Sequence, residues 1–450
     1  MASNAKTIAE LLNGDVTVTA TDIADDAVTS AKIATGAVIA DGLGAGAVTN
    51  EKLGAGAVTA TKLGTGVVTN EKLGTGVVTN EKLGAGAVTV NKVSGNLGRR
   101  NMIINGAMQV SQRGTSITGI TSGNNRTADR FSFTTGTNGG TYTLSTTTTV
   151  PSGEGFKKSL KLDCTTAGDY STAGTGTMLR CSPFEIQDCA RLSYGTSGAK
   201  KLTVSFWTRA SYTGTFTALL VTHDTAQRNI IKTFTIASAD TWQKVVLTYD
   251  GDTGSTFTGS DINLGVSLDI WMGGGSDYTG GSQTDGVWRA RSTHNSSILE
   301  GNGTKFGTNT SHNFYITGVQ VEQNDTATDF EHRTYAEELT LCQRYFEKDN
   351  PATPTSFGGS LRGVSFYLAN GSGNAQSRDG AFTSFATTKR TTPTMTLYSY
   401  NGTSGACSWI TGGGTDTNVY TRSGTTGFQT SSSTYRNFHV WFAWTAHCEL

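Results

Sequence analysis

The chain has 450 residues, of which 57 are glycine and 16% are charged, and its formal net charge at pH 7 is zero. A chain without a basic excess is a poor partner for nucleic acid or for anionic membranes. No apolar run of about 18 residues occurs, so the sequence predicts neither a membrane span nor a secretory leader. We therefore expect that the chain does not insert into a membrane and that it is synthesised in a cytoplasm. In that compartment, cysteines without CxxC spacing favour buried thiols over disulfides or zinc ligands.

Residues 1–26 begin with a short amphipathic segment. Ile8, Leu11 and Leu12 fall on one face of a predicted helix, and Asn13 with Gly14 is a typical helix stop. A segment this short cannot bury that face by itself. We expect residues 1–26 to dock on another protein and to become ordered there.

Residues 27–96 form seven consecutive ten-residue units, such as AVTNEKLGAG and VVTNEKLGTG. Each unit offers one valine and, five residues later, one leucine. Burying such a pair gives about 3 to 6 kcal/mol, whereas ordering ten residues of backbone costs about 10 to 20 kcal/mol. Several copies must then share one axis, in a fibrous shaft with the predicted core residues Val48, Leu53, Val58, Leu63, Val68, Leu73, Val78 and Leu83.

Within one unit, Thr49 is placed to cap a single helical turn over residues 50–52. Gly54 and Gly56 bracket a bend where φ is expected to be positive. The alternative is a flexible low-complexity linker. The constant spacing of valine and leucine argues against that alternative, because a linker has no reason to keep it.

Residues 97–333 show alternation of apolar and polar side chains, as in 202–211 and 241–250, separated by Gly, Asp and Ser turns. A segment of this length suits one β-sandwich. Residues 350–450 again have β character and end in a strongly apolar strand.

A helix is predicted over residues 334–349. Thr334 and Glu337 have the spacing of a capping box. The apolar positions recur as in a coiled-coil seam, at Tyr335, Leu339, Cys342 and Phe346. This helix can pack on the chain's own sandwich, or three copies of it can pack together around a molecular axis as a clamp. In either case the helix is a junction between the regions before and after it.

Aromatic side chains are the best candidates for binding, because a flat ring can cover the apolar face of a sugar while its polar edge stays hydrated. Tyr278 and Trp288 flank a glycine-rich loop at 273–288. The other candidates lie in the last region, at Tyr398, Tyr400, Trp409, Tyr420 and Tyr435. Packing in the interior or at a trimer axis is the alternative for each of them.

No pattern predicts catalysis. The histidines are scattered without HxH or HExxH spacing, so no metal site is predicted. A glycosidase needs two carboxylates on either side of a sugar, and the loops carry aspartates at Asp250, Asp252, Asp261 and Asp277. Aspartate is common in turns for structural reasons. We predict that the chain is not an enzyme, with no catalytic residues and no cofactor.

Four segments resemble a known family. They are RRNMIINGAMQVSQRGTS (99–116), TADRF (127–131), FYITGVQVE (314–322) and ATDFEHRTYAEELTLCQRYFEK (327–348). In their order and spacing they resemble the tail fibre proteins of bacteriophages, especially the short-tailed, T7-like phages of marine cyanobacteria. The region from 97 to 333 also resembles carbohydrate-binding jelly rolls. Such modules usually carry calcium-binding aspartates in the last strand, where this sequence has Thr317 and Gly318, so calcium is not expected.

The resemblance implies a mainly β, elongated homotrimeric fibre: a decapeptide-repeat shaft, a jelly-roll-like β-sandwich, a junction helix and a β-rich distal tip domain. Residues 1–26 would dock on virion tail or adaptor proteins, and residues 350–450 would bind a host surface glycan or an outer-membrane receptor. The main alternative is a tailspike depolymerase that cleaves host surface polysaccharide. Such enzymes often use β-helices whose coils repeat every 20 or so residues, and residues 97–450 show no such period. A spacer fibre that carries another adhesin is a third possibility.

Overall fold

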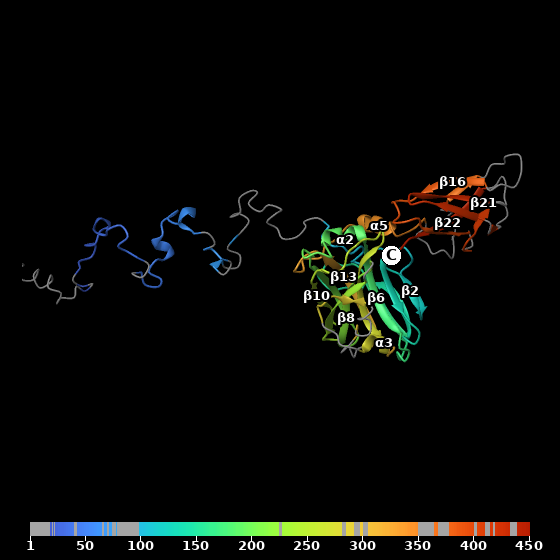
Figure 1. Cartoon of the computed structure of the whole chain (residues 1–450), viewed down its shortest axis with the longest axis horizontal. Helices are drawn as coiled ribbons and strands as arrows, with labels where there is room; N and C mark the ends of the chain where they lie inside the picture. The colour runs from blue at the N-terminus through green and yellow to red at the C-terminus, as the bar shows by residue number, and fades with distance from the viewer. Residues whose placement is uncertain are drawn as a thin grey trace, which may run out of the picture. The chain divides into compact units, whose positions relative to one another are not determined.

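The structure is a computed structural model of the chain, and it falls into two units, Met1–Thr89 and Val90–Leu450, which are described separately. The described residues are 19, 21, 23–39, 43–64, 67–69, 72–73, 78, 99–224, 227–280, 285–291, 298–299, 305–349, 364–367, 378–399, 403–409, 415–416, 419–432 and 439–450. Figure 1 shows the course of the chain.

The first unit is a series of short turns. Single 3-10 turns occur at η2 (Ser30–Lys32), η4 (Asn50–Lys52) and η5 (Ala60–Lys62), which confirms the predicted turn over 50–52. Gly56 closes the following bend with φ +75°, also as predicted, and Ala57 N donates to Gly54 O there (2.9 Å). The threonine hydroxyl behaves differently from the prediction, because Thr49 Oγ1 donates to Glu51 Oε2 (3.0 Å).

Each of these repeats is also braced by its lysine. Lys52 Nζ reaches back five residues and donates to Ala47 O (2.8 Å). The same bond recurs at Lys32, Lys62 and Lys72, whose acceptors are Ala27 O, Ala57 O and Val67 O. The shape of a repeat therefore depends on contacts within that repeat and its own two turns.

The second unit begins with a β-sandwich, as the alternation over 97–333 predicted. One sheet, called sheet A, has the order β1-β4-β5-β13-β7-β10. Its strands are β1 (Ser116–Ile120), β4 (Thr141–Thr147), β5 (Ser159–Thr166), β13 (Asn313–Glu322), β7 (Leu202–Ala210) and β10 (Gln243–Tyr249). The strand pairs within sheet A are antiparallel.

The facing sheet, called sheet B, has the order β12-β9-β8-β11-β6-β3-β2. Its strands are β12 (Arg289–Ala290), β9 (Arg228–Ile236), β8 (Gly214–Thr222), β11 (Leu264–Gly274), β6 (Gly176–Glu185), β3 (Phe131–Thr135) and β2 (Gly123–Asn125). Alternate residues of both sheets point inward, so Phe206, Phe216 and Phe314 are fully buried between them. The mainly β prediction is confirmed.

The helical segments of the sandwich that lie within the described residues are α2 (Ile186–Cys189), η9 (Ala190–Leu192), α3 (Ser276–Thr279) and α5 (Tyr335–Gln343). In α5 the capping box is present, with Glu337 N donating to the Thr334 hydroxyl and Thr334 N donating to the Glu337 carboxylate. Its buried face contacts the sandwich through Glu338, whose carboxylate accepts from Asn105 N (2.7 Å).

The predicted helix over 334–349 is too long. Helix α5 ends at Gln343, and Phe346 begins strand β14 (Phe346–Lys348). The predicted seam is wrong too, because Tyr335 is 55% exposed and Phe346 does not lie on the helix. The physical reason is a distant contact: Arg344 and Tyr345 both donate to the Glu185 carboxylate, which turns the chain out of the helix.

The C-terminal region is a second β structure, as predicted. Strands β14 and β22 (His439–His447) pair, so its sheet begins before residue 350, within the segment predicted as helix. The same sheet contains β15 (Val364–Tyr367), β17 (Thr394–Tyr398), β18 (Cys407–Trp409) and β19 (Thr415–Asp416). A three-stranded sheet of β16 (Arg378–Ser384), β21 (Gly427–Ser432) and β20 (Val419–Ser423) lies beside it (Figure 1). Between them lies a core that includes Phe385, Leu397, Phe428, Phe442 and Trp444.

Candidate functional site

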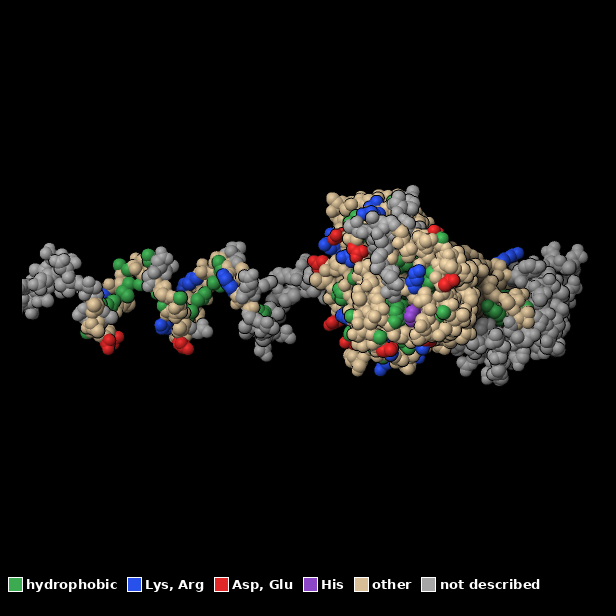
Figure 2. Space-filling model, turned by 90° about the horizontal axis from the view of Figure 1, so that it is seen from below, with side chains coloured by type: hydrophobic (Ala, Val, Ile, Leu, Met, Phe, Trp, Pro, Cys, Tyr) green, Lys and Arg blue, Asp and Glu red, His purple; other side chains and the backbone are tan. Residues whose placement is uncertain are grey.

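The predicted core residues of the shaft lie on the surface of the single chain. Figure 2 shows hydrophobic side chains along the first unit. Their exposed fractions are 52% for Val48, 42% for Leu53, 53% for Val58, 45% for Leu63, 52% for Val68, 42% for Leu73 and 51% for Val78. Leu83 lies outside the described residues. A trimer core at these positions stays a prediction.

Several other predicted residues cannot be placed. Ile8, Leu11, Leu12, Tyr400 and Tyr435 lie outside the described residues. Trp409 and Tyr420 lie on strands β18 and β20. Tyr398 is the last residue of β17 and is half-buried. A receptor-binding role for this group of residues 350–450 stays a prediction.

The two predicted aromatic residues of the sandwich are engaged in packing. The ring of Tyr278, in α3, lies 4.7 Å from that of Trp271 and belongs to a small apolar cluster on the outer face of sheet B. Trp288 packs edge-on against Tyr194 (5.8 Å), and its indole N–H donates to Asp250 O (2.7 Å). Both side chains are half-buried. These contacts favour the alternative of interior packing for this pair.

Two of the loop aspartates named in the sequence, Asp250 and Asp252, form ion pairs. Asp252 is buried, and its carboxylate accepts from Arg228 Nε (3.0 Å), Gly254 N (2.9 Å) and the Ser255 hydroxyl (2.6 Å). Asp250 is exposed and pairs with Lys201 (3.0 Å). At the position considered for calcium, Thr317 donates its hydroxyl to Lys158 O (2.7 Å). Among the described residues no group of three or more His, Cys, Asp or Glu could hold a metal ion.

Two polar pairs lie on the outer face of sheet B. Arg180 donates through Nε and Nη2 to both oxygens of Asp269 (2.9 and 3.0 Å). His223 Nε2 shares a hydrogen bond with Ser267 Oγ (2.8 Å). Burial lowers the pKa of His223 to about 4. The Ser267 side chain is fully buried, so this serine–histidine pair is a contact within the fold.

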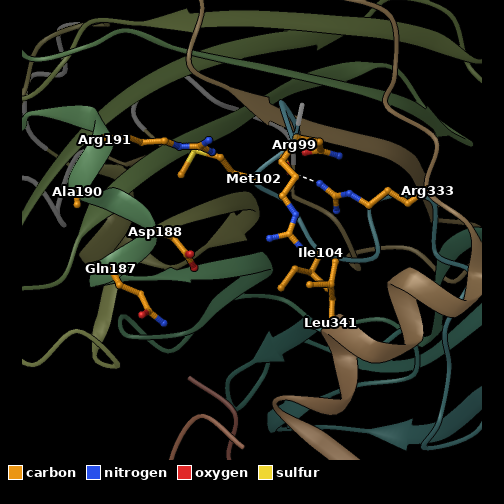
Figure 3. Close-up of a pocket in the computed structure, with 10 residues that line it drawn as sticks. Arg99, Met102, Ile104, Gln187, Asp188, Ala190, Arg191, Arg333 and Leu341 are labelled. Carbon is orange, nitrogen blue, oxygen red and sulfur yellow. Dashed lines mark hydrogen bonds between the residues drawn. The ribbon is translucent and has the colours of Figure 1, made fainter. Parts of the chain in front are cut away.

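A cavity of about 400 Å³ lies where the chain enters the sandwich (Figure 3). Gln187, Asp188 and Arg191 line it from one side, and Arg333 and Leu341 from the other, with Arg99 between them (Figure 3). Arg333 is committed to the fold, because it donates to Ile103 O (3.0 Å) and to Asn101 O. The lining mixes guanidinium groups with a carboxylate and contains no aromatic ring, so it lacks the stacking surface that a sugar site needs.

The sequence interpretation missed a group of aromatic side chains on the outer face of sheet A. They are Trp207 on β7, Tyr315 on β13 and Trp242, one residue before β10. The signal was present, because Trp207 and Tyr315 occupy the solvent-facing phase of strands whose other phase is apolar. An aromatic residue at that phase is less expected than a polar one.

Helices long and apolar enough to cross a membrane do not occur in the described part of the chain. No protein-family model matches the sequence. No curated protein matches it.

Among solved structures, a similar one is the enzymatically active domain of tailspike protein 4 of bacteriophage CBA120, with 13% identity and a TM-score of 0.26. That match covers 50% of this chain and 21% of the tailspike chain, so this chain spans about a fifth of it. A family 11 carbohydrate-binding module from Clostridium thermocellum, solved with a mixed-linked tetrasaccharide, has 9% identity and a TM-score of 0.22, with 48% of this chain and 99% of the module covered. The tandem CBM22 domain of Xyn10C from Paenibacillus barcinonensis has 10% identity and a TM-score of 0.23, with 79% and 100% covered. At these TM-scores the similarities do not show what this chain does.

Proposed function

We propose that this chain is a phage tail fibre that attaches the virion to its host by binding a glycan on the cell surface. The observation that carries the proposal is the exposure of the repeat valines and leucines, from 42% to 53% for Val48, Leu53, Val58 and Leu63. A repeated apolar pair left in water needs a partner. The partner with the same ten-residue spacing is another copy of the same chain.

The copies are proposed to form a parallel homotrimer. In a parallel arrangement each valine and each leucine contacts the equivalent residue of the neighbouring copies. All units can then bury their apolar side chains in a single register. The number three is what the resemblance to tail fibres implies. The internal turns and the lysine bond of each repeat support this arrangement, because they fix where the side chains emerge.

The polarity of the fibre follows from the order of its parts. Residues 1–26 would dock on a tail or adaptor protein, which leaves the C-terminal region to meet the cell. The three receptor sites of one trimer can bind at the same time, so a weak affinity of each site for a glycan suffices. The fibre would be made in the host cytoplasm and reside in the virion tail. It would bind without catalysing a reaction and without a cofactor.

Light scattering on the intact chain tests the proposal. Three copies per particle are expected, together with protection of residues 27–96 from protease. A folded monomer with a protease-resistant 27–96 segment would contradict it, because the repeats would then be stable alone. Purified fibre should also compete with virions for adsorption to host cells.

A further inference from the structure

We propose that the outer face of sheet A is a binding platform for neutral pyranose sugars, formed by Trp207, Trp242 and Tyr315 with two flanking ion pairs. The inference rests on the proposed function for its ligand class. It concerns a site on the sandwich, which is separate from the proposed receptor site in residues 350–450. Strand β13, which carries Tyr315, and strand β10, which begins directly after Trp242, are labelled in Figure 1.

Tyr315 lies at the centre of the platform. It is directly opposite Lys161 on β5 and Arg209 on β7, so the three side chains form one row across the sheet. Arg209 Cζ lies 5.1 Å and Lys161 Nζ 5.5 Å from the centroid of the tyrosine ring. The Trp242 ring meets Tyr315 edge to face at 6.0 Å. With 8% of its surface exposed, Tyr315 supports the side chains around it.

The two tryptophans supply the open surface. Trp207 lies two residues before Arg209 on β7, opposite Lys244, which places it diagonally from Trp242. Both tryptophans are half-buried. Neither indole N–H has a hydrogen-bond partner in the part of the chain that the structure describes. A packed tryptophan usually finds such a partner, as Trp288 does with Asp250 O (2.7 Å), so Trp207 and Trp242 keep a ring and a donor for a ligand.

Two ion pairs hold polar groups beside the rings. Arg209 donates to Asp240 O (2.9 Å) and to Asp240 Oδ1 (2.8 Å), and Lys161 Nζ lies 2.7 Å from Asp163 Oδ2. A guanidinium has five donors and an ammonium three, so each pair keeps unused donors and carboxylate lone pairs. These groups suit the hydroxyls of a sugar, whose C–H face can lie on the tryptophans. Because each cation is already paired, the row favours a neutral sugar over a polyanion.

The platform has a defined border. Next to it the same outer face is closed by the chain itself, where the hydroxyls of Thr203 and Thr248 donate to Asn324 O (2.8 Å) and Asp325 O (3.3 Å). Thr203 is fully buried as a result, whereas Trp207 and Arg209 on the same strand are not. The open half of the face is thus the half that carries the tryptophans.

Affinity electrophoresis of the intact chain tests the platform. The gels would contain one neutral polysaccharide each: dextran, laminarin, hydroxyethylcellulose, xylan or galactomannan. We expect retardation by at least one of them, and weakening by about tenfold or more in Trp207→Ala and in Trp242→Ala. Trp242→Phe should keep most of the binding. Tyr335→Ala, which removes an exposed aromatic ring on α5, is the matched control and should bind as the parent does.

Three results would overturn the inference. The first is no retardation in any gel, and the second is unchanged binding by both tryptophan variants at an unchanged melting temperature. The third is equal weakening by the control Tyr335→Ala, which would show that the loss of binding does not depend on the tryptophan surface. Light scattering on Trp207→Ala adds a check, since a changed number of copies would make this face an interface between chains. Host adsorption separates the two proposals: if no gel retards the chain while Trp409→Ala still weakens adsorption to host cells, the fibre function stands and the platform fails.

Discussion

Arg130 and Glu449 form an ion pair in which the arginine side chain is completely buried and the glutamate is 4% exposed. Arg130 lies directly before strand β3 of the sandwich, and its guanidinium also covers the ring of Tyr345 at 3.4 Å. Glu449 follows the last strand of the C-terminal region. Its Oε1 also forms an ion pair with Arg113 Nη2 (3.0 Å). Arg390 donates to Cys448 O (2.9 Å) beside it. These buried contacts join the C-terminal region to the sandwich.

Replacing Glu449 with Gln should destabilise this joint strongly. Arg130 would remain buried without its counter-charge, which costs about 3 to 5 kcal/mol in comparable pairs. Thermal or urea unfolding of the purified chain gives the measurement. Asp250→Asn is the control, because the Asp250–Lys201 pair is exposed to solvent, which screens it, and so contributes little to stability. Equal effects of the two substitutions would contradict the assigned role of Glu449.

Stability should depend on pH in opposite senses at two carboxylates of the joint. Burial raises the pKa of Asp129 to about 6 from 3.8, against the opposing effect of Arg113. Burial also disfavours the Glu449 carboxylate, but Arg130, Arg113 and Arg126 hold its pKa at about 2. The folded chain therefore loses stability as pH rises from about 4 to about 6 through Asp129, by up to about 3 kcal/mol. It loses the Glu449 contribution as pH falls from about 4.5 toward 2.

Denaturant unfolding of the parent and of Asp129→Asn at several pH values separates these two effects. The variant should lack the decline between about pH 4 and 6 and keep the one at lower pH. Parallel curves for the two proteins over the whole range would show that Asp129 has an ordinary pKa.

Placing charge at the repeat leucines should prevent assembly of the shaft. Leu63→Asp together with Leu73→Asp would bury unpaired carboxylates between copies, which is prohibitive. We expect light scattering to report monomers and protease to cleave within residues 27–96. Thr61→Asp alters a neighbouring exposed position of the same repeat and should leave the assembly intact. A trimer that tolerates both leucine substitutions would place the contact elsewhere.

Receptor binding is expected at the aromatic residues of the C-terminal region. Trp409→Ala, Tyr420→Ala or Tyr435→Ala should reduce adsorption to host cells, by about tenfold or more when combined, because three weak sites then fail together. Their melting temperatures should change little. Tyr278→Ala and Trp288→Ala should instead lower the melting temperature, since both rings are packed. Normal adsorption by the C-terminal variants, with loss at Tyr278 or Trp288, would place the receptor site on the sandwich.

The chain should not hydrolyse host polysaccharide. Asp252 is fixed by Arg228 and by its own loop, and Asp250 pairs with Lys201, so neither is poised for acid or base catalysis. The assay incubates purified fibre with envelope glycans and follows reducing ends. Steady release would favour a depolymerase, and substitution of Asp250, Asp252, Asp261 and Asp277 would then locate its carboxylates.

Local patterns predicted the parts of the fold that depend on neighbouring residues. The turn at 50–52, the positive φ of Gly56 and the capping box of Thr334 all follow from short-range rules, and the structure shows them. The end of helix α5 could not be predicted in this way, because it depends on Tyr345 bonding to Glu185, 160 residues away. The start of the C-terminal sheet at Phe346 was missed for the same reason.

The candidate site shows a similar division. The sequence drew attention to aromatic residues near glycine-rich loops, but Trp288 there uses its N–H on Asp250 O. Whether a tryptophan ring stays open to solvent depends on how the strands pair and on which segments cover the outer face of each sheet. The sequence of a single strand contains neither piece of information. Trp207 and Trp242 become neighbours only when β7 and β10 pair.

The bond from Lys52 to Ala47, repeated from Lys32 to Ala27 and from Lys62 to Ala57, has a consequence for the length of the molecule. Each decapeptide sets its own backbone path without help from the units before and after it. One unit can then be duplicated or lost without disturbing the geometry of the rest. Evolution can adjust the reach of such a chain in steps of one decapeptide, while the domains at its ends stay unchanged.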